Sequence, residues 1–538
     1  MINFLFFILI CSQVFCQGLV TNSSYVNIIK NEVNSLMYNK ISDELFIAPY
    51  IQKNPDRNKH LNLTAKLIKN QRLIIEPITS IRFSNSGFEF SEKNTQSFWF
   101  TPGIKIKSII PIVNNFKSIW MYSWTEFYKH SSIFEHGLNN PHQLFKYNPS
   151  HSIGFYTSSI EPSKGYDFDE SQAGISILSN SFELVFGKFK TSFGPFFRGN
   201  LSISNYSPAL DQVLVKLKDE KFIFSYMIAS LDSNLPRFHS ESLGLEESEL
   251  FTDQWLLDDS IFDSITSNYT GNARFSSWER YVAYHRLDFK IKPNLRLGVY
   301  EKIIFGGRSI PLSYLIPILP FWSSQHESGD LDNLMIGFDF DFISSKCMND
   351  KPCRFYGAIM MDEWAPYSTF SKDNRNWFAF QIGFSKLEKF FSKSVLFKLE
   401  YTKIPSNVYN HRFIINEPKH HGYNLGFWSG NHSDDFFLSS SIILNNDSYI
   451  NFSYEHTRFT SNSYIDRIND LENQYNNISI GFLENGYNKR IKTNITYSFQ
   501  IQTGIFFDLG LSSFNTKGLY SKNDFYDFTI KIRYNIFK

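Results

Sequence analysis

The sequence has almost no net charge, since 53 Lys and Arg residues face 52 Asp and Glu residues over 538 positions. A protein that binds nucleic acid carries a basic excess, so this balance argues against a nucleic-acid partner. The sequence also has no apolar run of the roughly 20 residues that a membrane-spanning helix requires. Two candidate runs, 2–10 and 312–321, are about half that length. These absences exclude a bundle of membrane helices.

Cysteine is scarce, with four residues in the chain, two of them within the first sixteen positions. The other two, Cys347 and Cys353, stand in the stretch CMNDKPC. A zinc site would need a C-x2-C spacing and further ligands, so we predict no metal site. In an exported protein a small disulfide loop is the favoured interpretation, with two free thiols as the alternative.

Catalytic motifs are missing as well. The sequence has no P-loop, no G-x-S-x-G, no H-E-x-x-H and no dinucleotide fingerprint. We therefore expect neither an enzymatic activity nor a cofactor.

The first sixteen residues resemble a secretory signal peptide. Residues 1–16, MINFLFFILICSQVFC, contain a short apolar core, with Val14 and Cys16 at the −3 and −1 positions of a cleavage site. This predicts a signal peptide at 1–16 and a mature chain that starts at Gln17. A lipoprotein with Cys16 as the lipidated residue is the alternative.

One amphipathic helix is expected over residues 22–41, within a helical segment at 17–60. Its apolar residues recur at helical spacing, and the stripe needs a partner. They are Val26, Ile29, Val33, Leu36, Met37 and Ile41.

From about residue 61 to the end, apolar and polar residues alternate in strand after strand, and about twenty candidate strands can be counted. In 333–342, NLMIGFDFDF, one face is apolar and the other carries Asp339 and Asp341. The last stretch, 528–538, is also amphipathic and has an aromatic residue one position from its end. Aromatic residues make up 17% of the chain, which suits half-apolar strands in a membrane wall.

The connections between these strands alternate in length. From 232 to 420, long connections such as 232–279 and 306–332 alternate with short ones such as Pro293–Asn294. Bacterial barrels have short periplasmic turns and long external loops. The pattern predicts a large closed antiparallel transmembrane β-barrel at 61–538, in the outer membrane of a Gram-negative bacterium, with any disulfide on the periplasmic side. Lumen-facing charges would include Arg286, Asp288, Asp339 and Asp341.

Several aromatic residues in the outer connections lie close to polar ones. Such groups suit glycan contacts, but the same rings could form the aromatic girdle at the lipid interface, and that alternative is favoured. The candidate glycan contacts are Trp322, Gln325, His326, Asp362, Glu363, Trp364 and Trp428.

His285 interrupts the apolar face of strand 280–292, and Glu301 interrupts that of strand 295–305. A three-residue turn at 292–294 pairs Ile291 with Leu295 and places His285 opposite Glu301. A hydrogen-bonded pair on a lipid face costs less than two separate polar groups. We predict a cross-strand pair near the outer interface that locks the register. The alternative is a functional pair under another protein or glycan.

An ordered series of segments resembles the Wzi family of capsule-assembly proteins. The segments are RYVAYHRLDF (280–289), LRLGVYEKIIFGGR (295–308), LIPILPFWSSQHESGDLDNLMIGFDFDF (315–342), FYGAIMMDEWAP (355–366) and HGYNLGFWSGNHSDD (421–435).

The resemblance implies an outer-membrane barrel of about eighteen strands with a helical part on the periplasmic side. It further implies a lectin-like role without catalysis. Such a barrel would attach or organise capsular polysaccharide, exopolysaccharide or lipopolysaccharide, and would contact outer-membrane lipid. A porin-like channel for solutes or polymer is the alternative function, because the predicted lumen carries both signs of charge.

Overall fold

The computed structural model describes most of the strand region and a short part of the N-terminal region. The described ranges are 22–41, 47–48, 65–68, 71–84, 97–111, 120–134, 165–231, 279–362, 377–460, 482–518 and 522–534, apart from single positions and pairs within them. The predicted signal peptide at 1–16, like Glu363 and Trp364, lies outside these residues.

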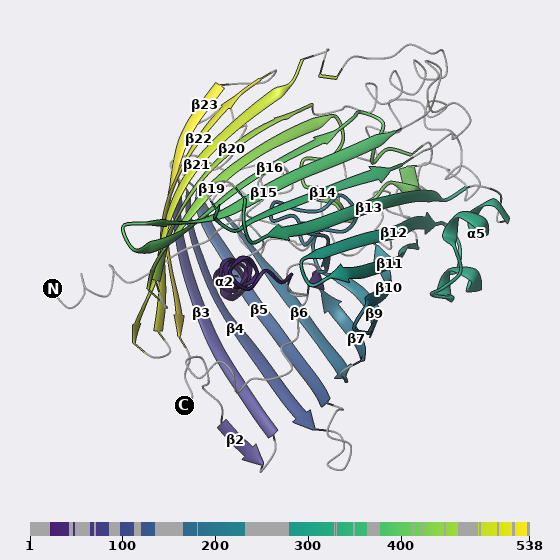
Figure 1. Ribbon diagram of the computed structural model, residues 1–538, viewed down its shortest axis with the longest axis horizontal. Coiled ribbons are helices and arrows are strands. Elements are labelled where there is room, and N and C mark those ends of the chain that lie inside the picture. Colours follow the sequence, from purple (N-terminus) through teal and green to yellow (C-terminus); the bar gives the residue numbers. More distant parts are fainter. Residues whose placement is uncertain are drawn as a thin grey trace.

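Eighteen strands close into one antiparallel barrel, in sequence order, with β23 pairing back onto β3 (Figure 1). The first half of the ring consists of β3 (Gln71–Ser84), β4 (Ser97–Pro111), β5 (Trp120–Phe134), β6 (Gly165–Leu178), β7 (Phe182–Phe189), β9 (Leu210–Lys218), β10 (Phe222–Leu231), β11 (Arg280–Lys292) and β12 (Leu295–Gly306). The second half consists of β13 (Asn333–Ser344), β14 (Cys353–Met361), β15 (Phe378–Phe390), β16 (Lys393–Ile404), β19 (Ser433–Asn445), β20 (Ser448–Phe459), β21 (Asn488–Gln502), β22 (Ile505–Lys517) and β23 (Lys522–Tyr534). The expected fold class and strand number are confirmed.

Smaller elements accompany the ring. The strand β2 (Ala65–Ile68) extends β3, and two short sheets pair β1 (Ile47–Ala48) with β8 (Ser192–Phe193) and β17 (Lys419–His420) with β18 (Tyr423–Asn424). The helical elements are α2 (Asn22–Tyr38), α5 (Phe321–Glu327), η6 (Leu312–Leu315) and η9 (Ile414–Asn416). No helix among the described residues is long and apolar enough to cross a membrane.

Connection lengths differ between the two ends of the barrel. At one end the described turns are short, such as Phe391–Ser392, where both residues have positive φ (44° and 65°) as in a tight hairpin. At the other end the connections are long, except for the four residues 518–521 between β22 and β23. We call these the short-turn end and the loop end.

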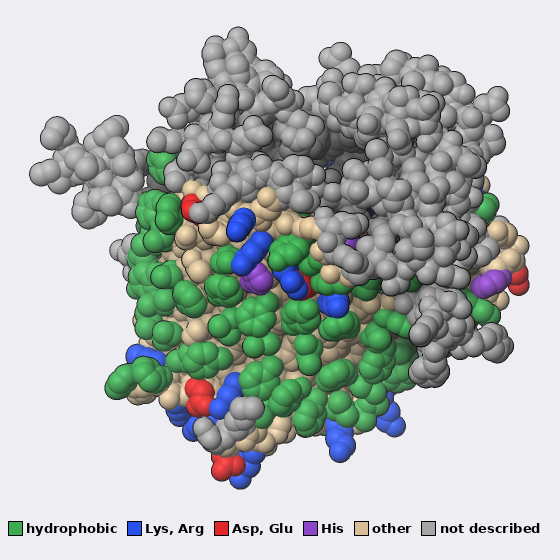
Figure 2. All heavy atoms as spheres, turned by 90° about the horizontal axis from the view of Figure 1, so that it is seen from above, with side chains coloured by type: hydrophobic (Ala, Val, Ile, Leu, Met, Phe, Trp, Pro, Cys, Tyr) green, Lys and Arg blue, Asp and Glu red, His purple; other side chains and the backbone are tan. Residues whose placement is uncertain are grey.

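The wall has an apolar outer face and a polar inner face, as alternation along each strand requires. Outward residues such as Ile382, Ile495 and Leu511 are 51–57% exposed. Inward residues such as Ser385, Asn494 and Ser512 are buried. Figure 2 shows the apolar side chains as a band across the wall, with Lys, Arg, Asp and Glu at its lower edge. Such a band is what a wall in contact with lipid presents.

The main core lies inside the barrel. Helix α2 enters from the short-turn end, and its buried residues Ile29, Val33 and Leu36 join a cluster with residues of the wall and of two long loops (Figure 1). The expected amphipathic helix is therefore present. Met37, however, which the spacing assigned to the apolar stripe, is 62% exposed.

The hairpin of β11 and β12 follows the predicted register with one error. His285 pairs with Glu301, and Phe289 with Leu297, as the alternation requires. The predicted pair of Ile291 with Leu295 is wrong, because a bulge between Lys290 and Lys292 places Lys292 opposite Leu295. The bulge absorbs one residue, so the turn contains two residues instead of three.

Candidate functional site

The loop between β7 and β9, residues 190–209, folds into the lumen. We call it the β7–β9 loop. Its residues Phe193, Leu201 and Ile203 are each 1% exposed. Wall side chains donate to three of its carbonyl oxygens: Arg354 to Pro195 at 3.2 Å, Gln381 to Gly199 at 2.9 Å and Lys302 to Ser202 at 3.0 Å. The wall thus satisfies backbone groups that would otherwise be buried without partners.

A carboxylate of the wall holds the tip of this loop. The two oxygens of Glu400 accept hydrogen bonds from the backbone N–H groups of Phe197 and Arg198, each at 2.9 Å. The Tyr356 hydroxyl donates to the same carboxylate at 2.7 Å. Three donors on one buried carboxylate compensate its desolvation.

Arg198 ties the loop to the next two strands of the wall, β19 and β20. Its guanidinium donates to both oxygens of Asp435, at 3.1 and 3.0 Å, and lies 3.3 Å from Glu455. Arg490 pairs with Glu455 at 3.1 Å. Both guanidinium carbons lie near the ring of Trp428, at 5.3 and 5.4 Å from its centroid. These are cation–π distances, so Trp428 is part of the charged cluster.

A second loop, residues 405–432, lies against the first. We call it the β16–β19 loop. Its Tyr409 hydroxyl donates to Leu201 O at 2.6 Å and accepts from Phe427 N at 3.1 Å. Burial raises the pKa of Tyr409. Asp362 accepts a hydrogen bond from the backbone N–H of Tyr409. The two loops and the wall therefore form one connected closure of the lumen.

The four predicted lumen charges are all inside and almost fully buried, at 0–2% exposure. Arg286 pairs with Asp288 and Asp339, each at 2.6 Å, and Asp341 pairs with Arg354 at 2.9 Å. Gly298 makes this possible, because a Cβ there would lie 2.2 Å from the Arg286 guanidinium. Each of these buried charges therefore has an oppositely charged partner within the wall, which offsets part of its desolvation.

Helix α2 is tied to the same network by Glu32, which is 0% exposed. Its Oε1 accepts from Ser385 at 2.6 Å and from Arg354 at 3.2 Å, and its Oε2 lies 2.6 Å from Lys398. Burial by itself would raise the pKa of Glu32, but the Lys398 and Arg354 cations outweigh it and bring the pKa to about 2. The helix is thus anchored by an ionised carboxylate at the short-turn end.

The cross-strand pair lies on the outside of the barrel. His285 Nε2 is 2.8 Å from Glu301 Oε2, and the His285 ring lies parallel to the Phe321 ring with centroids 4.3 Å apart. Pro317 O is 3.0 Å from His285 Nδ1, and Phe321 N donates to Glu301 at 2.8 Å. The segment containing η6 and α5 therefore covers the pair from outside. It also covers outward residues of β10–β12 such as Ile303, which is 0% exposed.

The candidate glycan contacts that the structure describes lie in two separate places. Trp322 is on α5 outside the barrel and is 57% exposed. Next to it, Gln325 donates to Asp332 O at 2.7 Å, and His326 Nδ1 lies 2.7 Å from Trp322 O. Asp362 and Trp428, by contrast, belong to the closure of the lumen and are 7% and 2% exposed.

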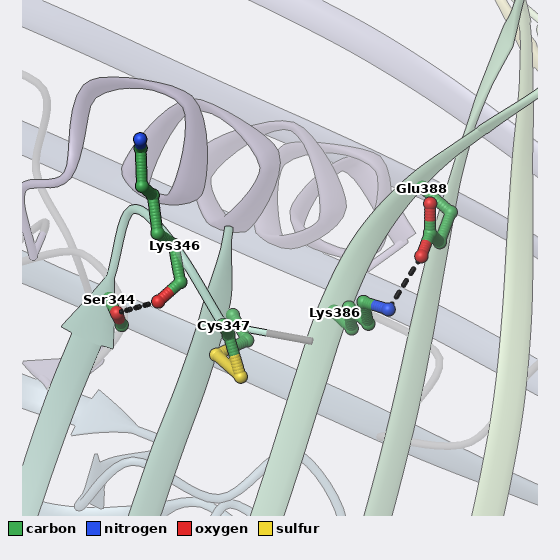
Figure 3. Close-up of a disulfide and its surroundings, with 6 residues drawn as sticks. Ser344, Lys346, Cys347, Lys386 and Glu388 are labelled. Carbon is green, nitrogen blue, oxygen red and sulfur yellow. Dashed lines mark hydrogen bonds and ion pairs between the residues drawn. A yellow bond between two sulfur atoms is a disulfide. The ribbon is translucent and has the colours of Figure 1, made fainter. Parts of the chain in front are cut away.

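Cys347 and Cys353 form a disulfide at the short-turn end, in the link between β13 and β14 (Figure 3). Their Cα atoms are 5.9 Å apart. Beside it, Ser344 donates to Lys346 O at 2.8 Å, and Lys386 pairs with Glu388 at 2.6 Å. In the described parts of the chain no group of three or more His, Cys, Asp or Glu residues is placed to hold a metal ion.

The sequence comparisons identify the family. The family model described as "Capsule assembly protein Wzi" matches residues 161–513, which include both loops of the closure and the outer pair. The chain belongs to the Wzi family. No curated protein matches it. As a member of this family with a closed, apolar-banded barrel, the chain is an outer-membrane protein.

Several solved outer-membrane barrels are similar to the chain at low sequence identity. Wzi from Escherichia coli is described as an outer membrane protein involved in group 1 capsule assembly and as a carbohydrate-binding β-barrel. It has a TM-score of 0.51 and 12% identity, covering 86% of this chain and 85% of its own. OprD from Pseudomonas aeruginosa has a TM-score of 0.43 and 10% identity, covering 86% and 95%. OccAB4 from Acinetobacter baumannii has 0.44 and 12%, covering 90% and 100%.

Sequence reasoning missed the β7–β9 loop and the role of Glu32. One signal for the loop is its composition, since Gly194 and Gly199 flank two Phe residues and an Arg. In the structure both glycines have positive φ, at 129° and 130°. Such a stretch is unsuited to a strand and carries a charge among apolar residues. For Glu32, the signal is a carboxylate beside the apolar stripe of the helix.

Proposed function

We propose that this barrel binds surface polysaccharide at the cell surface and helps attach or organise it, without catalysis. The match to the Wzi family over residues 161–513 carries the proposal. The E. coli member is described as a carbohydrate-binding barrel. The glycan would be a capsular polysaccharide, an exopolysaccharide or a lipopolysaccharide. Residues 1–16 would serve export, 17–60 would form the periplasmic segment and 61–538 the barrel.

The packed lumen favours this role over a porin-like channel. The β7–β9 loop, the β16–β19 loop and α2 all insert between the described walls, and charges such as Arg286 and Arg354 are 1% exposed. A channel for solutes would instead leave such charges in contact with water. In planar bilayers we expect the purified barrel to be electrically silent, and a large steady conductance would favour the porin.

Among the candidate glycan contacts, we propose Glu363 and Trp364 as the residues that meet an external glycan, and we assign Asp362 to the closure of the lumen. Asp362 stands at the loop end of β14, and the next two residues continue the sequence into the connection that follows. A Trp ring offers a face for the C–H side of a sugar, and carboxylates accept from hydroxyl groups. We assign Trp322 to the aromatic girdle, since it lies outside the barrel, and Trp428 to the closure of the lumen.

The test is retention of the polysaccharide by purified barrel on beads. We expect E363Q/W364A to lose most of the retained polysaccharide. The control W322A also removes one Trp ring, from the outer surface of the barrel, and should retain the polysaccharide. Equal retention by both variants would exclude the proposed contacts. In cells, deletion should release polysaccharide into the medium without stopping its synthesis. Unchanged surface retention after deletion would refute the proposed function itself.

A further inference from the structure

A row of charged residues crosses the outer wall near the loop end. Lys403 pairs with Asp434, Asp434 with Arg458, Arg458 with Lys489, and Lys489 with Lys517. These five residues, which we call the charged row, stand on five adjacent strands, β16 and β19–β22. The row therefore places four cations and one carboxylate side by side at one level.

The charged row faces outward. On each of its strands, residues an even number of positions away belong to the exposed apolar band. These are Phe397, Leu438, Phe452, Ile495 and Leu511, at 38–53% exposure. Their neighbours of opposite parity, such as Asp435, Glu455 and Arg490, are buried in the lumen. On the face seen in Figure 2, Lys and Arg side chains and a His gather at the upper edge of the apolar band.

The height of the row matches the membrane interface. Ten residues separate Ser448, which follows the short turn, from Arg458. At ~3.3 Å per residue and a tilt of ~40°, this rise is about 25 Å, the height of the apolar band of such barrels. The short turns face the periplasm in this class of barrel, so the row lies among the head groups of the outer leaflet.

Positive charge dominates the row. Arg458 donates to Asp434 through Nε at 2.9 Å and through its NH2 group. The only carboxylate of the row is therefore already paired. Within the described residues no carboxylate pairs with Lys489 or Lys517. Like charges directly opposite each other on neighbouring strands destabilise a sheet. Lys489 and Lys517, two adjacent cations beside the Arg458–Asp434 pair, therefore need an anion from outside the wall.

The surroundings of the row also fit a ligand at the interface. Tyr487 is 37% exposed, and the Arg458 guanidinium carbon lies 5.5 Å from its ring centroid. Lys403 Nζ lies 4.4 Å from the Phe482 centroid. Two residues below Arg458, His456 Nε2 has no hydrogen-bond partner among the described residues. Aromatic rings beside cations, above an apolar band, are typical of contact with lipid head groups.

We propose that the charged row binds the phosphate groups of lipid head groups in the outer leaflet. Arg458, Lys489 and Lys517 are the phosphate-binding residues, with the acyl chains of the lipid lying on the apolar band below. This site is separate from the polysaccharide role proposed above and does not depend on it.

The test compares lipid binding by delipidated barrel in dodecyl maltoside, measured by native mass spectrometry. The probe is lipid A with two phosphates. We expect K489Q/K517Q to bind it about twenty-five-fold more weakly, since each surface lysine contributes roughly fivefold to anionic lipid binding. K489R/K517R should bind like the unchanged protein, and 0.5 M NaCl should weaken binding of the unchanged protein.

The matched control is K292Q/K389Q, which removes two exposed lysines at the short-turn end and should not alter binding. Heat-modifiable migration on gels verifies that each variant is folded. Equal binding by K489Q/K517Q and the unchanged protein would overturn the proposal, as would equal binding of lipid A without phosphates. Inorganic phosphate alone binding as tightly as lipid A would also overturn it, because the site would then select a free anion.

Discussion

Replacing Glu32 by Ala should release α2 from the lumen. The carboxylate is fully buried and neutralises Lys398 at 2.6 Å and Arg354 at 3.2 Å. Removing one member of a buried ionic cluster typically costs about 3–5 kcal/mol, and here Lys398 would lose its carboxylate partner while Arg354 would keep only Asp341. At about 1.4 kcal/mol per factor of ten, the opening of α2 should become at least about a hundredfold more frequent.

Hydrogen exchange in detergent micelles measures this opening directly. Amides of residues 29–38 in E32A should exchange about a hundredfold faster or more, whereas those of the wall strands should be unchanged. The pH dependence provides a second readout. The pKa of Glu32 falls from its ordinary value of 4.5 to about 2 in the docked helix. Docking is therefore fully stabilised above pH 4.5 and loses this contribution as the pH falls towards 2.

Lys398→Met is the matched control. It leaves Glu32 with Arg354 and Ser385, so it should accelerate exchange of the helix less than E32A does. Exchange of α2 in folded E32A barrels as slow as in the unchanged protein would contradict the ionic anchoring of the helix. Apolar packing would then be sufficient to hold α2 in the lumen.

Three further outcomes are expected. Glu301→Ala leaves two donors without an acceptor, which should cost about 1–3 kcal/mol each and lower the thermal unfolding temperature. Replacing Cys347 and Cys353 by Ser should cost about 2 kcal/mol, the entropy of so short a loop, and speed exchange in the β13–β14 link alone. Burial lowers the pKa of His432, whose Nε2 accepts from Leu483 N, so exchange at this amide should rise as the pH falls below 6.5 and the ring protonates.

The wall could be predicted from the sequence because the alternation of apolar and polar residues that specifies it lies within each strand. A period of two assigns each residue to one face, and matching apolar faces leave His285 little choice but Glu301. The bulge at Lys290–Lys292 was not predicted, because the alternation of apolar and polar residues does not reveal an extra residue beside a turn.

The closure of the lumen could not be predicted, because its contacts join distant parts of the chain. Glu400 binds the β7–β9 loop, which is about 200 residues away in the chain. No pattern in either segment predicts that the two are in contact. The same limit applies to the aromatic candidates. Trp322 and Trp428 both follow strands and neighbour polar residues, yet one lies outside the wall and the other inside it. Which side a loop folds towards depends on the shape of the closed barrel.

The β7–β9 loop and helix α2 differ in how each is attached to the wall. The β7–β9 loop continues into a wall strand at both ends, so it cannot leave the lumen without stretching the wall. Helix α2 precedes every wall strand, so no wall strand adjoins its N-terminal end, and it is held by apolar packing and by the ion pairs of Glu32 with Arg354 and Lys398. The loop end is thus closed by a segment joined to the wall at both ends, whereas the short-turn end is closed by a helix joined to the ring at one end only.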